Sequence, residues 1–379
     1  MMSSLIVVGL ALIILLLSVL LGKKNKLFAD RFLILYLTFA AFWHVYTYIE
    51  YSGLLLNSYW MLMGKGIYLL HAPFLFLYIY ALTAQKKLQT KHYVVLFLPF
   101  IIYTVHFFYY YLLVFDGAAL SINHGLLYIN GGLSTTWLIF AGLFLIIDPI
   151  FLIVSYYLLK TYKKSLLIAV SNTDQINLNW LNVLFYLWLA ISVILVPFGT
   201  LTVGSGWFST EFLDILSEIL SVAFFFILGF YGFKQTTIFT NLELKGELPS
   251  KPTSGYYQRS GLSTLQAKAY HEQLLTLMEE KKPYLNGELT AGELSKLLGI
   301  SVNHLSQVLN KEQKQNFFDF VNSYRIKEVL AKMKEPGNDH LTLLAIALNS
   351  GFNSKTSFNT IFKKATNQTP SQYYQSLKR

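Results

Sequence analysis

The sequence predicts an all-α protein in which a seven-helix transmembrane bundle is followed by a cytoplasmic domain with two helix-turn-helix motifs joined by a long helix. Hydrophobic residues make up 54% of the 379 residues and charged residues only 13%, against roughly 25% in an average soluble domain. The apolar excess lies before Phe233, in runs long enough to cross a bilayer. Beyond Phe233 the composition is typical of a soluble region, and one motif occurs there twice.

Seven apolar runs are predicted to be membrane spans. Each is near the roughly 20 residues that a helix needs to cross the hydrocarbon core, and helices are expected because backbone polar groups need partners in lipid. The first run has no basic residue before it and three lysines after it, which favours a retained helix over a cleaved signal peptide. The spans are expected at about 4–21, 32–49, 61–83, 93–115, 136–159, 181–203 and 212–233.

Charges in the connecting loops predict the orientation of the bundle. All ten Lys and Arg residues of the loops between spans lie in three alternate loops, 22–31, 84–92 and 160–180. The positive-inside rule then places the N terminus outside the membrane and the C-terminal region in the cytoplasm.

Five ionisable side chains within the spans are candidates for a signal pocket. Such groups are costly in lipid and usually face the interior of a bundle. Either they line a cavity open to the outside, or they make interhelical hydrogen bonds that hold the bundle together. The histidines lie on three different helices without ligand spacing, so no metal site is predicted. The five candidates are His44, His71, His106, Asp148 and Glu218.

A linker and a basic region follow the last span. Residues 241–262 are rich in Gly, Pro, Ser and charge, which is typical of a flexible connection. The predicted division is therefore a sensor domain at 1–239, a linker at 240–262 and a second domain at 263–379. Residues 234–379 hold 19 Lys and Arg against 12 Asp and Glu, which indicates an anionic partner, either nucleic acid or an acidic membrane surface.

The second domain contains two copies of a helix-turn-helix pattern. A capping box at Thr290 and Glu293 begins a short helix, which breaks at Gly299, and Ser301 caps the next helix. The pattern recurs 52 to 53 residues later, with Gly351 in the turn. One copy would fit an ordinary helical hairpin equally well, but two copies in a basic domain favour DNA binding, with each second helix in a major groove.

A long amphipathic helix at 317–333 is predicted between the two copies. At 1.5 Å per residue it is roughly 25 Å long, so it can hold two recognition helices about one duplex turn, near 34 Å, apart.

The outward face of each second helix supplies the predicted DNA contacts. Asn and Gln can pair with adenine, Lys can reach guanine or phosphate, and Thr can touch a thymine methyl. The predicted residues are Asn303, Ser306, Gln307, Asn310 and Lys311 in the first copy, and Asn353, Ser354, Lys355, Thr356, Ser357, Thr360, Lys363 and Lys364 in the second.

Residues 263–379 resemble the DNA-binding domain of AraC/XylS-family transcriptional regulators. The resemblance rests on segments 299–312, 316–328 and 346–364 and on the pair Thr369-Pro370. It implies transcription-factor activity, double-stranded DNA as partner and base contacts from the two outward faces. Three positions depart from the family pattern, which often has Arg, Gly and a basic residue where this chain has Thr360, Asn367 and Tyr374.

The N-terminal half is similar, in architecture alone, to multi-helix membrane sensors fused to such domains in some bacteria. The sequence thus predicts a one-component receptor in a bacterial cytoplasmic membrane, with the bilayer and an unknown signal ligand as further partners. A homodimer and a contact with RNA polymerase stay open. The alternative is a transporter or membrane enzyme with a basic partner-binding tail, but related halves and catalytic motifs are missing from the sequence. No cofactor, catalytic residue or enzyme activity is predicted.

Overall fold

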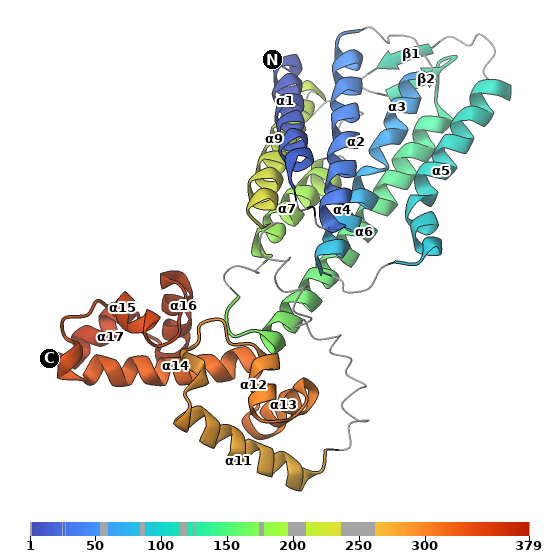
Figure 1. Ribbon diagram of the computed structural model, residues 1–379. Coiled ribbons are helices and arrows are strands. Elements are labelled where there is room, and N and C mark those ends of the chain that lie inside the picture. Colours follow the sequence, from blue (N-terminus) through green and yellow to red (C-terminus); the bar gives the residue numbers. More distant parts are fainter. Residues whose placement is uncertain are drawn as a thin grey trace. The chain divides into compact units, whose positions relative to one another are not determined.

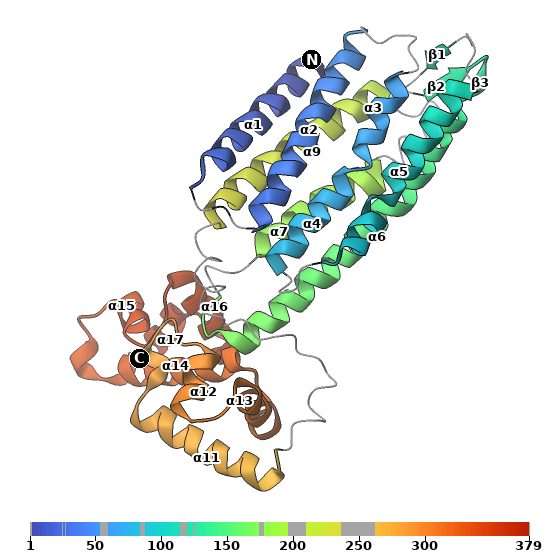
Figure 2. The ribbon, with the colours of Figure 1, turned by 45° about the vertical axis from the view of Figure 1, so that its right-hand side comes forward.

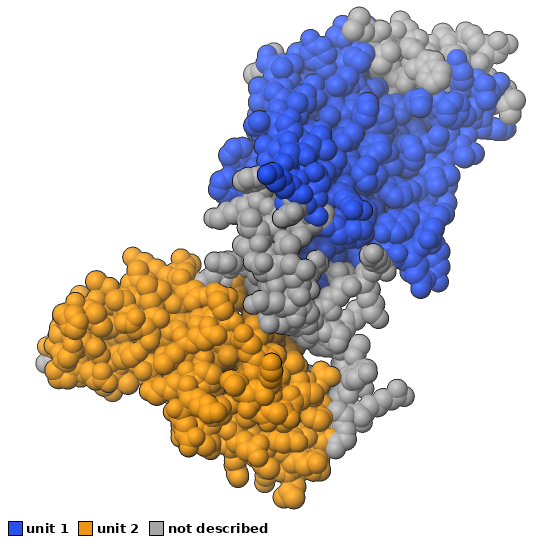
Figure 3. Space-filling model, in the orientation of Figure 1, with its two compact units in different colours: residues 1–160, 178–236 blue, residues 161–177, 237–379 orange. Residues whose placement is uncertain are grey.

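The computed structural model describes residues 2–378 except for nine short stretches, and it divides into two compact units (Figure 3). Unit 1 comprises residues 1–160 and 178–236, and unit 2 comprises residues 161–177 and 237–379. Unit 2 thus includes a stretch, 161–177, that the sequence-based division assigned to the membrane region. The stretches left out are 25, 27, 54–59, 84–87, 114–119, 124–125, 174–177, 196–209 and 236–261.

Unit 1 is built from apolar helices. Among the described residues, six helical stretches are long and apolar enough to cross a membrane, which agrees with a membrane-embedded region. One of the six, Gly66–Thr83, runs from the end of α3 through α4. Helices α1, α2 and α9 pack side by side (Figures 1 and 2). The helices are α1 (Met2–Gly22), α2 (Phe28–Tyr51), α3 (Trp60–Tyr68), α4 (His71–Thr83), α5 (Thr90–Leu113), α6 (Thr135–Ala169), α7 (Asn179–Leu189) and α9 (Thr210–Gln235).

Two predicted spans differ from the structure. The span expected at 61–83 consists of two helices, α3 and α4, because Pro73 has no N–H to donate to the carbonyl of Leu69. The span expected at 181–203 begins as α7 and continues as a π-helix, Ala190–Leu195. Residues 196–209 lie outside the described residues, so the predicted count of seven spans stays a prediction.

A small antiparallel sheet occupies part of the predicted loop at 116–135. Its strands are β1 (Leu120–Asn123), β2 (Leu126–Ile129) and β3 (Gly132–Leu133), in the order β1-β2-β3. Asn130 and Gly131 both have positive φ angles, +50° and +77°, as an Asn-Gly hairpin turn requires. The all-α prediction overlooked this sheet, although the Asn-Gly pair between apolar residues was a signal for it.

Unit 2 contains the two predicted helix-turn-helix modules. The first consists of α12 and α13 with α11 packed against α13, the second consists of α15, α16 and α17, and α14 joins them (Figures 1 and 2). A π-helix, Leu309–Gln313, extends α13, and 3-10 turns occur at Pro283–Leu285 and Pro336–Asn338. The bounds are α11 (Thr264–Glu280), α12 (Ala291–Leu297), α13 (Val302–Val308), α14 (Phe317–Lys334), α15 (Leu343–Leu348), α16 (Lys355–Thr366) and α17 (Pro370–Leu377).

The predicted caps and turns are present in both modules. The Thr290 hydroxyl accepts from the Glu293 N–H at 3.1 Å, and the Glu293 carboxylate accepts from the Thr290 N–H at 3.0 Å. Ser301 caps α13 by accepting from the His304 N–H. Gly299 and Gly351, in the two turns, have φ angles of +68° and +91°, which residues other than Gly rarely adopt.

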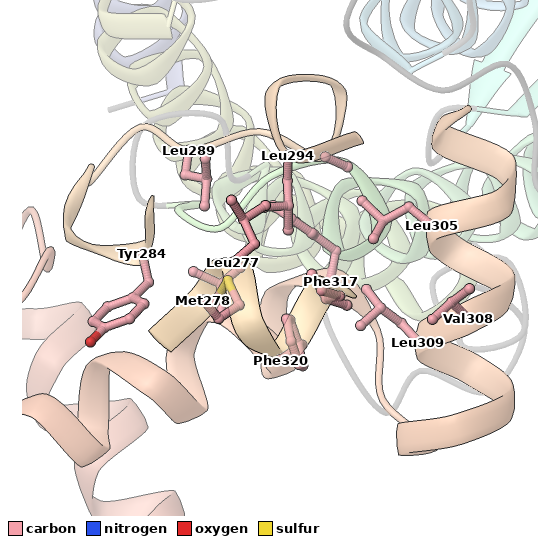
Figure 4. Packing of buried hydrophobic residues seen from close by; sticks show 13 residues of the cluster. Leu277, Met278, Tyr284, Leu289, Leu294, Leu305, Val308, Leu309, Phe317 and Phe320 are labelled. Carbon is pink, nitrogen blue, oxygen red and sulfur yellow. The ribbon is translucent and has the colours of Figure 1, made fainter. Parts of the chain in front are cut away.

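Each module has its own hydrophobic core, and α14 contributes to both. The first core, shown in Figure 4, includes Phe317 and Phe320 of α14 together with Leu294 and Leu305. The second core includes Val329 of α14, along with residues of α15 and α16. The expectation of a long helix linking two modules is therefore confirmed, and α14 is the strut on which both are built.

Candidate functional site

The recognition helix of the first module, α13, presents part of the predicted contact set. Leu305, Val308 and Leu309 are buried as expected, and Asn303, Asn310 and Lys311 are exposed. Ser306 is half-buried, and its backbone carbonyl accepts from the Asn310 amide at 2.8 Å. This bond sets the orientation of the Asn310 amide on the outer face.

Gln307 is a correction to the predicted contact set. Its side chain is 3% exposed, so the expectation that it lies on the outward face was wrong. Helix α13 contacts α11 and α12 as well as the π-helix that follows it, so less of its surface is free than a single apolar stripe suggests. The amphipathic pattern alone could not show this.

The recognition helix of the second module, α16, is more exposed. Phe358 and Phe362 are buried and hold the helix on the second core. Ser354 caps α16 by accepting from the half-buried Ser357 N–H at 3.1 Å, so its hydroxyl already has a structural role. The other predicted contact residues are all exposed, namely Asn353, Lys355, Thr356, Thr360, Lys363 and Lys364.

The lysines on the outward face of α16 are accessible to DNA phosphate, because Lys355, Lys363 and Lys364 are all exposed. Lys364 makes an ion pair with Asp319 of α14 at 2.9 Å, but its side chain is 73% exposed. An ion pair this exposed contributes little to stability, because water and salt screen it. Phosphate can therefore replace Asp319 at small cost.

Two of the departures from the family pattern have structural explanations. Asn367 ends α16 in the left-handed conformation, at φ +58°, and Asn tolerates this region better than other non-glycine residues. The Tyr374 hydroxyl donates to Asp339 at 3.0 Å, and the Lys378 ammonium lies 4.7 Å from the centre of the Tyr374 ring. A cation is thus still present beside position 374.

Arg325, at the centre of α14, is a buried residue that the sequence analysis did not single out. It is 1% exposed, and its guanidinium donates to the carbonyls of Tyr284 and Asn286, both at 2.8 Å. It also bonds to Ser171, which lies in a distant part of the chain. Burial lowers the pKa of Arg325 to about 10, so it is still charged at neutral pH. The sequence did hold a signal for its burial: Arg325 lies four residues from both Val321 and Val329, so it falls within the apolar stripe of α14.

In unit 1, polar side chains from several spans meet in pairs. His44 Nε2 lies 3.3 Å from Glu218 Oε1, and Gly9 of α1 makes room for them, since a Cβ there would approach His44 to 2.9 Å. The Tyr36 hydroxyl lies 2.6 Å from His71 Nε2. Asp148 accepts from the Trp188 indole N–H at 2.9 Å.

A cavity lies among these groups. His44 and His71 line it, and Trp188 links it to Asp148. The remaining walls are largely aromatic, formed by Tyr36, Phe39, Trp43, Tyr68, Phe224 and Phe225. Of the other predicted residues, Glu218 and Asp148 contact the lining residues His44 and Trp188, and His106 is not among the lining residues. No set of three or more metal-ligating side chains occurs among the residues that the structure describes.

Comparison with known proteins agrees with the geometry of unit 2. Residues 294–376 match the family model of a helix-turn-helix domain. Uncharacterized HTH-type transcriptional regulators of Staphylococcus aureus strains COL, MSSA476 and N315 are 33% identical over 114 residues. The match covers 28% of this chain and 15% of each relative. No solved structure matches.

These matches are to transcriptional regulators and not to enzymes. The C-terminal region of this chain is therefore a DNA-binding domain of the AraC helix-turn-helix type, as the sequence resemblance implied.

Proposed function

We propose that this chain is a membrane-anchored, sequence-specific transcriptional regulator that acts as a one-component receptor. Residues 1–239 are its seven-span sensor domain, 240–262 its linker and 263–379 its DNA-binding domain. The observation that carries the proposal is a pair of capped helix-turn-helix modules on one strut, in a chain whose described residues include six helical stretches long and apolar enough to cross a membrane. The alternative, a transporter or membrane enzyme with a tail that only binds a partner, does not explain why residues 294–376 match a DNA-binding domain.

Two features support the proposal that the two modules recognise a bipartite DNA site. Helix α14 has 18 residues and is about 27 Å long at 1.5 Å per residue, close to the roughly 34 Å of one duplex turn. The recognition helices on either side of it expose hydrogen-bonding side chains of the kinds that read base edges. Two groups of read bases, roughly 10 base pairs apart, follow from this arrangement.

Mapping the chromosomal sites crosslinked to the full-length protein tests the proposed DNA binding. We expect the sites to share a long bipartite motif. A variant with Lys355→Ala and Thr356→Ala should relax the preference in one half only. Sites that share no motif, with occupancy that follows only charge and salt, would contradict sequence-specific regulation.

The proposed topology has the N terminus outside and the DNA-binding domain in the cytoplasm of a bacterium. It is supported by the loop charges, since residues 116–135 hold no Lys or Arg whereas 84–92 hold three. Reporter domains fused after Lys234 or within 84–92 should be cytoplasmic, and those within 116–135 external. Access to Lys245 only from outside would overturn both the topology and the function.

The cavity of unit 1 is the proposed signal pocket. Its support is a buried polar atom that points to a missing partner: His71 Nδ1 makes no hydrogen bond within the described part of the chain. Such groups normally find a partner, which here would be a bound ligand or water. The aromatic walls suit a ligand with a flat or apolar body, and the imidazoles suit a hydrogen-bonding group on it.

Two histidine variants separate a signal pocket from a purely structural role. His71→Ala removes a side chain that lines the cavity, whereas His106→Ala removes one that does not. We expect both proteins to be inserted at normal levels, and only His71→Ala to lose regulation of the mapped target promoter. Equal regulation in both variants, or a loss of folded protein in His71→Ala alone, would favour the structural role.

A further inference from the structure

Residues 161–173 belong to unit 2 and lie against the DNA-binding domain. They are the end of α6 and the residues just after it, so the same helix supplies a predicted membrane span and this contact. Val170 pairs with Thr290 in an antiparallel bridge, and the Ser171 N–H donates to the Leu289 carbonyl at 3.2 Å. The segment thus makes an isolated β-bridge in front of the first module.

Ser171 is the centre of the contact. Its hydroxyl donates to the Leu289 carbonyl at 2.7 Å and accepts from Arg325 Nη2 at 2.9 Å. Its own carbonyl accepts from Arg325 Nη1 and from the Asn322 amide, both at 3.1 Å. Ser171 and Arg325 are each 1% exposed, so these bonds are sealed from water.

The residues that hold Ser171, which we call the seat, are Leu289, Asn322 and Arg325. The seat needs an occupant, because the buried Arg325 guanidinium uses oxygens of the docked segment as hydrogen-bond acceptors. The hydrogen bonds of Arg325 go to neutral oxygens, and Ser171 provides two of these acceptors. A buried guanidinium that loses acceptors is costly, since a charge needs hydrogen bonds when it leaves water. Departure of the segment therefore requires the seat to open to solvent.

The seat lies where both modules meet. Leu289 and Thr290 begin the first module, and Arg325 is the middle of the strut. Gly351, in the turn of the second module, is so close that an added Cβ would lie 2.2 Å from the Tyr284 carbonyl oxygen and 3.0 Å from Arg325 Nε. A segment bound here can influence the distance and angle between the two recognition helices.

One carboxylate connects the segment to the predicted DNA face. Glu288 Oε1 accepts from the Asn353 amide, and the Asn172 amide lies 3.5 Å from the same oxygen. Asn353 directly precedes the cap of α16 and is a predicted DNA contact. The bond to Glu288 uses one of the two N–H donors of the Asn353 amide and holds that amide against a carboxylate, and a carboxylate held at this face repels phosphate.

We propose that residues 161–173 are an intramolecular docking segment that holds the DNA-binding domain in a state of low DNA affinity, and that regulation works by releasing it. The proposal rests on the proposed function, because it assumes that the domain binds DNA in the full-length protein. It assigns to the end of α6 the part of an internal ligand, and to Arg325 the part of a positioning residue that binds it.

The absence of natural cysteine in the chain makes a direct test simple. Val170 and Thr290 occupy a non-hydrogen-bonded pair of the bridge, where Cα atoms are about 4.5 Å apart, within the range of a disulfide. Full-length protein with Val170→Cys and Thr290→Cys, in its membrane, should form an intramolecular disulfide on oxidation. Val170→Cys with Lys334→Cys is the control, since Lys334 is nine residues, about 13 Å, beyond Arg325 on α14.

DNA affinity is then measured with a duplex selected from a random library by the reduced protein. We expect the oxidised protein to bind this duplex at least tenfold more weakly than the same protein after reduction. Ser171→Ala should raise affinity several-fold, because it removes both hydroxyl bonds. Ser165→Ala is the control and should have no effect, because the Ser165 hydroxyl donates to the Tyr162 carbonyl within α6 and, among the described residues, the contacts with the first module and Arg325 are made by Val170, Ser171 and Asn172.

Each other outcome overturns the proposal. No disulfide, or one that joins two copies, would show that the segment does not occupy this seat in its own chain. Equal or tighter binding by the oxidised protein would show that docking does not inhibit. If no duplex is selected, the proposed function fails, while the disulfide yield still decides whether the segment docks.

Discussion

The two helix-turn-helix modules follow one plan but build their recognition helices differently. Helix α13 has seven residues and passes into a π-helix, whereas α16 has twelve residues and ends at the left-handed Asn367. The exposed predicted contacts of the first module are Asn303, Asn310 and one lysine, Lys311, whereas those of α16 include three lysines, Lys355, Lys363 and Lys364.

This difference indicates a division of work between the modules. Neutral amides contribute little affinity for phosphate but discriminate between bases, whereas lysines contribute affinity that salt weakens. The first module is therefore expected to set base preference more than overall affinity. The second is expected to contribute to both.

The largest effect is expected from truncating the two cores. Phe320→Ala in the first core and Phe362→Ala in the second should each cost about 3 to 5 kcal/mol of unfolding free energy, since both side chains are at most 1% exposed. Because the cores are separate, hydrogen exchange of the full-length protein should show Phe362→Ala weakening α15–α17 and sparing α11–α13. Loss of protection in both modules from either change would show that they unfold as one.

The next effect concerns base preference in each module. Asn303→Ala and Lys355→Ala should each relax preference at one group of bases, by about 1 to 3 kcal/mol. Selection of duplexes from a random library by each variant measures this. If the two variants relax the same positions, or relax none, the modules do not read separate half-sites.

A smaller effect is expected from a phosphate contact. Lys363→Ala should weaken binding evenly across sequences and reduce the slope of affinity against salt by roughly one unit, because one fewer counterion is released. Lys268 of α11 is also exposed, so Lys268→Ala is the matched control and should leave the slope unchanged. Equal slopes for both variants would remove Lys363 from the interface.

The smallest effect concerns the end of α16. Asn367→Ala should destabilise the second module by about 1 kcal/mol, because alanine is disfavoured at φ +58°, whereas Asn367→Gly should be neutral or slightly stabilising. The midpoint temperature of thermal unfolding of each full-length variant ranks their stabilities. An alanine variant as stable as the glycine variant would mean that the backbone changes its conformation at this cap.

Much of unit 2 could be predicted because its signals are local. The capping box at Thr290 and Glu293, the turn glycines Gly299 and Gly351, and the apolar period of α14 all involve residues within a few positions of one another. Such interactions depend little on the rest of the chain, so they can be recognised without a structure. The break before α4 could not be predicted from Pro73 alone, since α5 and α6 continue through Pro99 and Pro149.

The sites that involve distant residues could not be predicted in the same way. Gln307 is buried because other elements pack around α13, and no periodicity within the helix reveals them. The sequence named His44, His71, Asp148 and Glu218 as costly in lipid. Only packing decides that His44 lies beside Glu218, which is 174 positions away, and that His106 stays apart from the cavity.

A membrane region of apolar helices and a helical, basic domain with two turn motifs could be predicted without a structure, because length, hydropathy and capping are local properties. Tertiary structure alone decided that the end of α6 occupies a seat beside Arg325, through bonds between residues 154 positions apart. A buried cation accepts any well-placed oxygen, and which oxygen reaches it depends on the path of the whole chain.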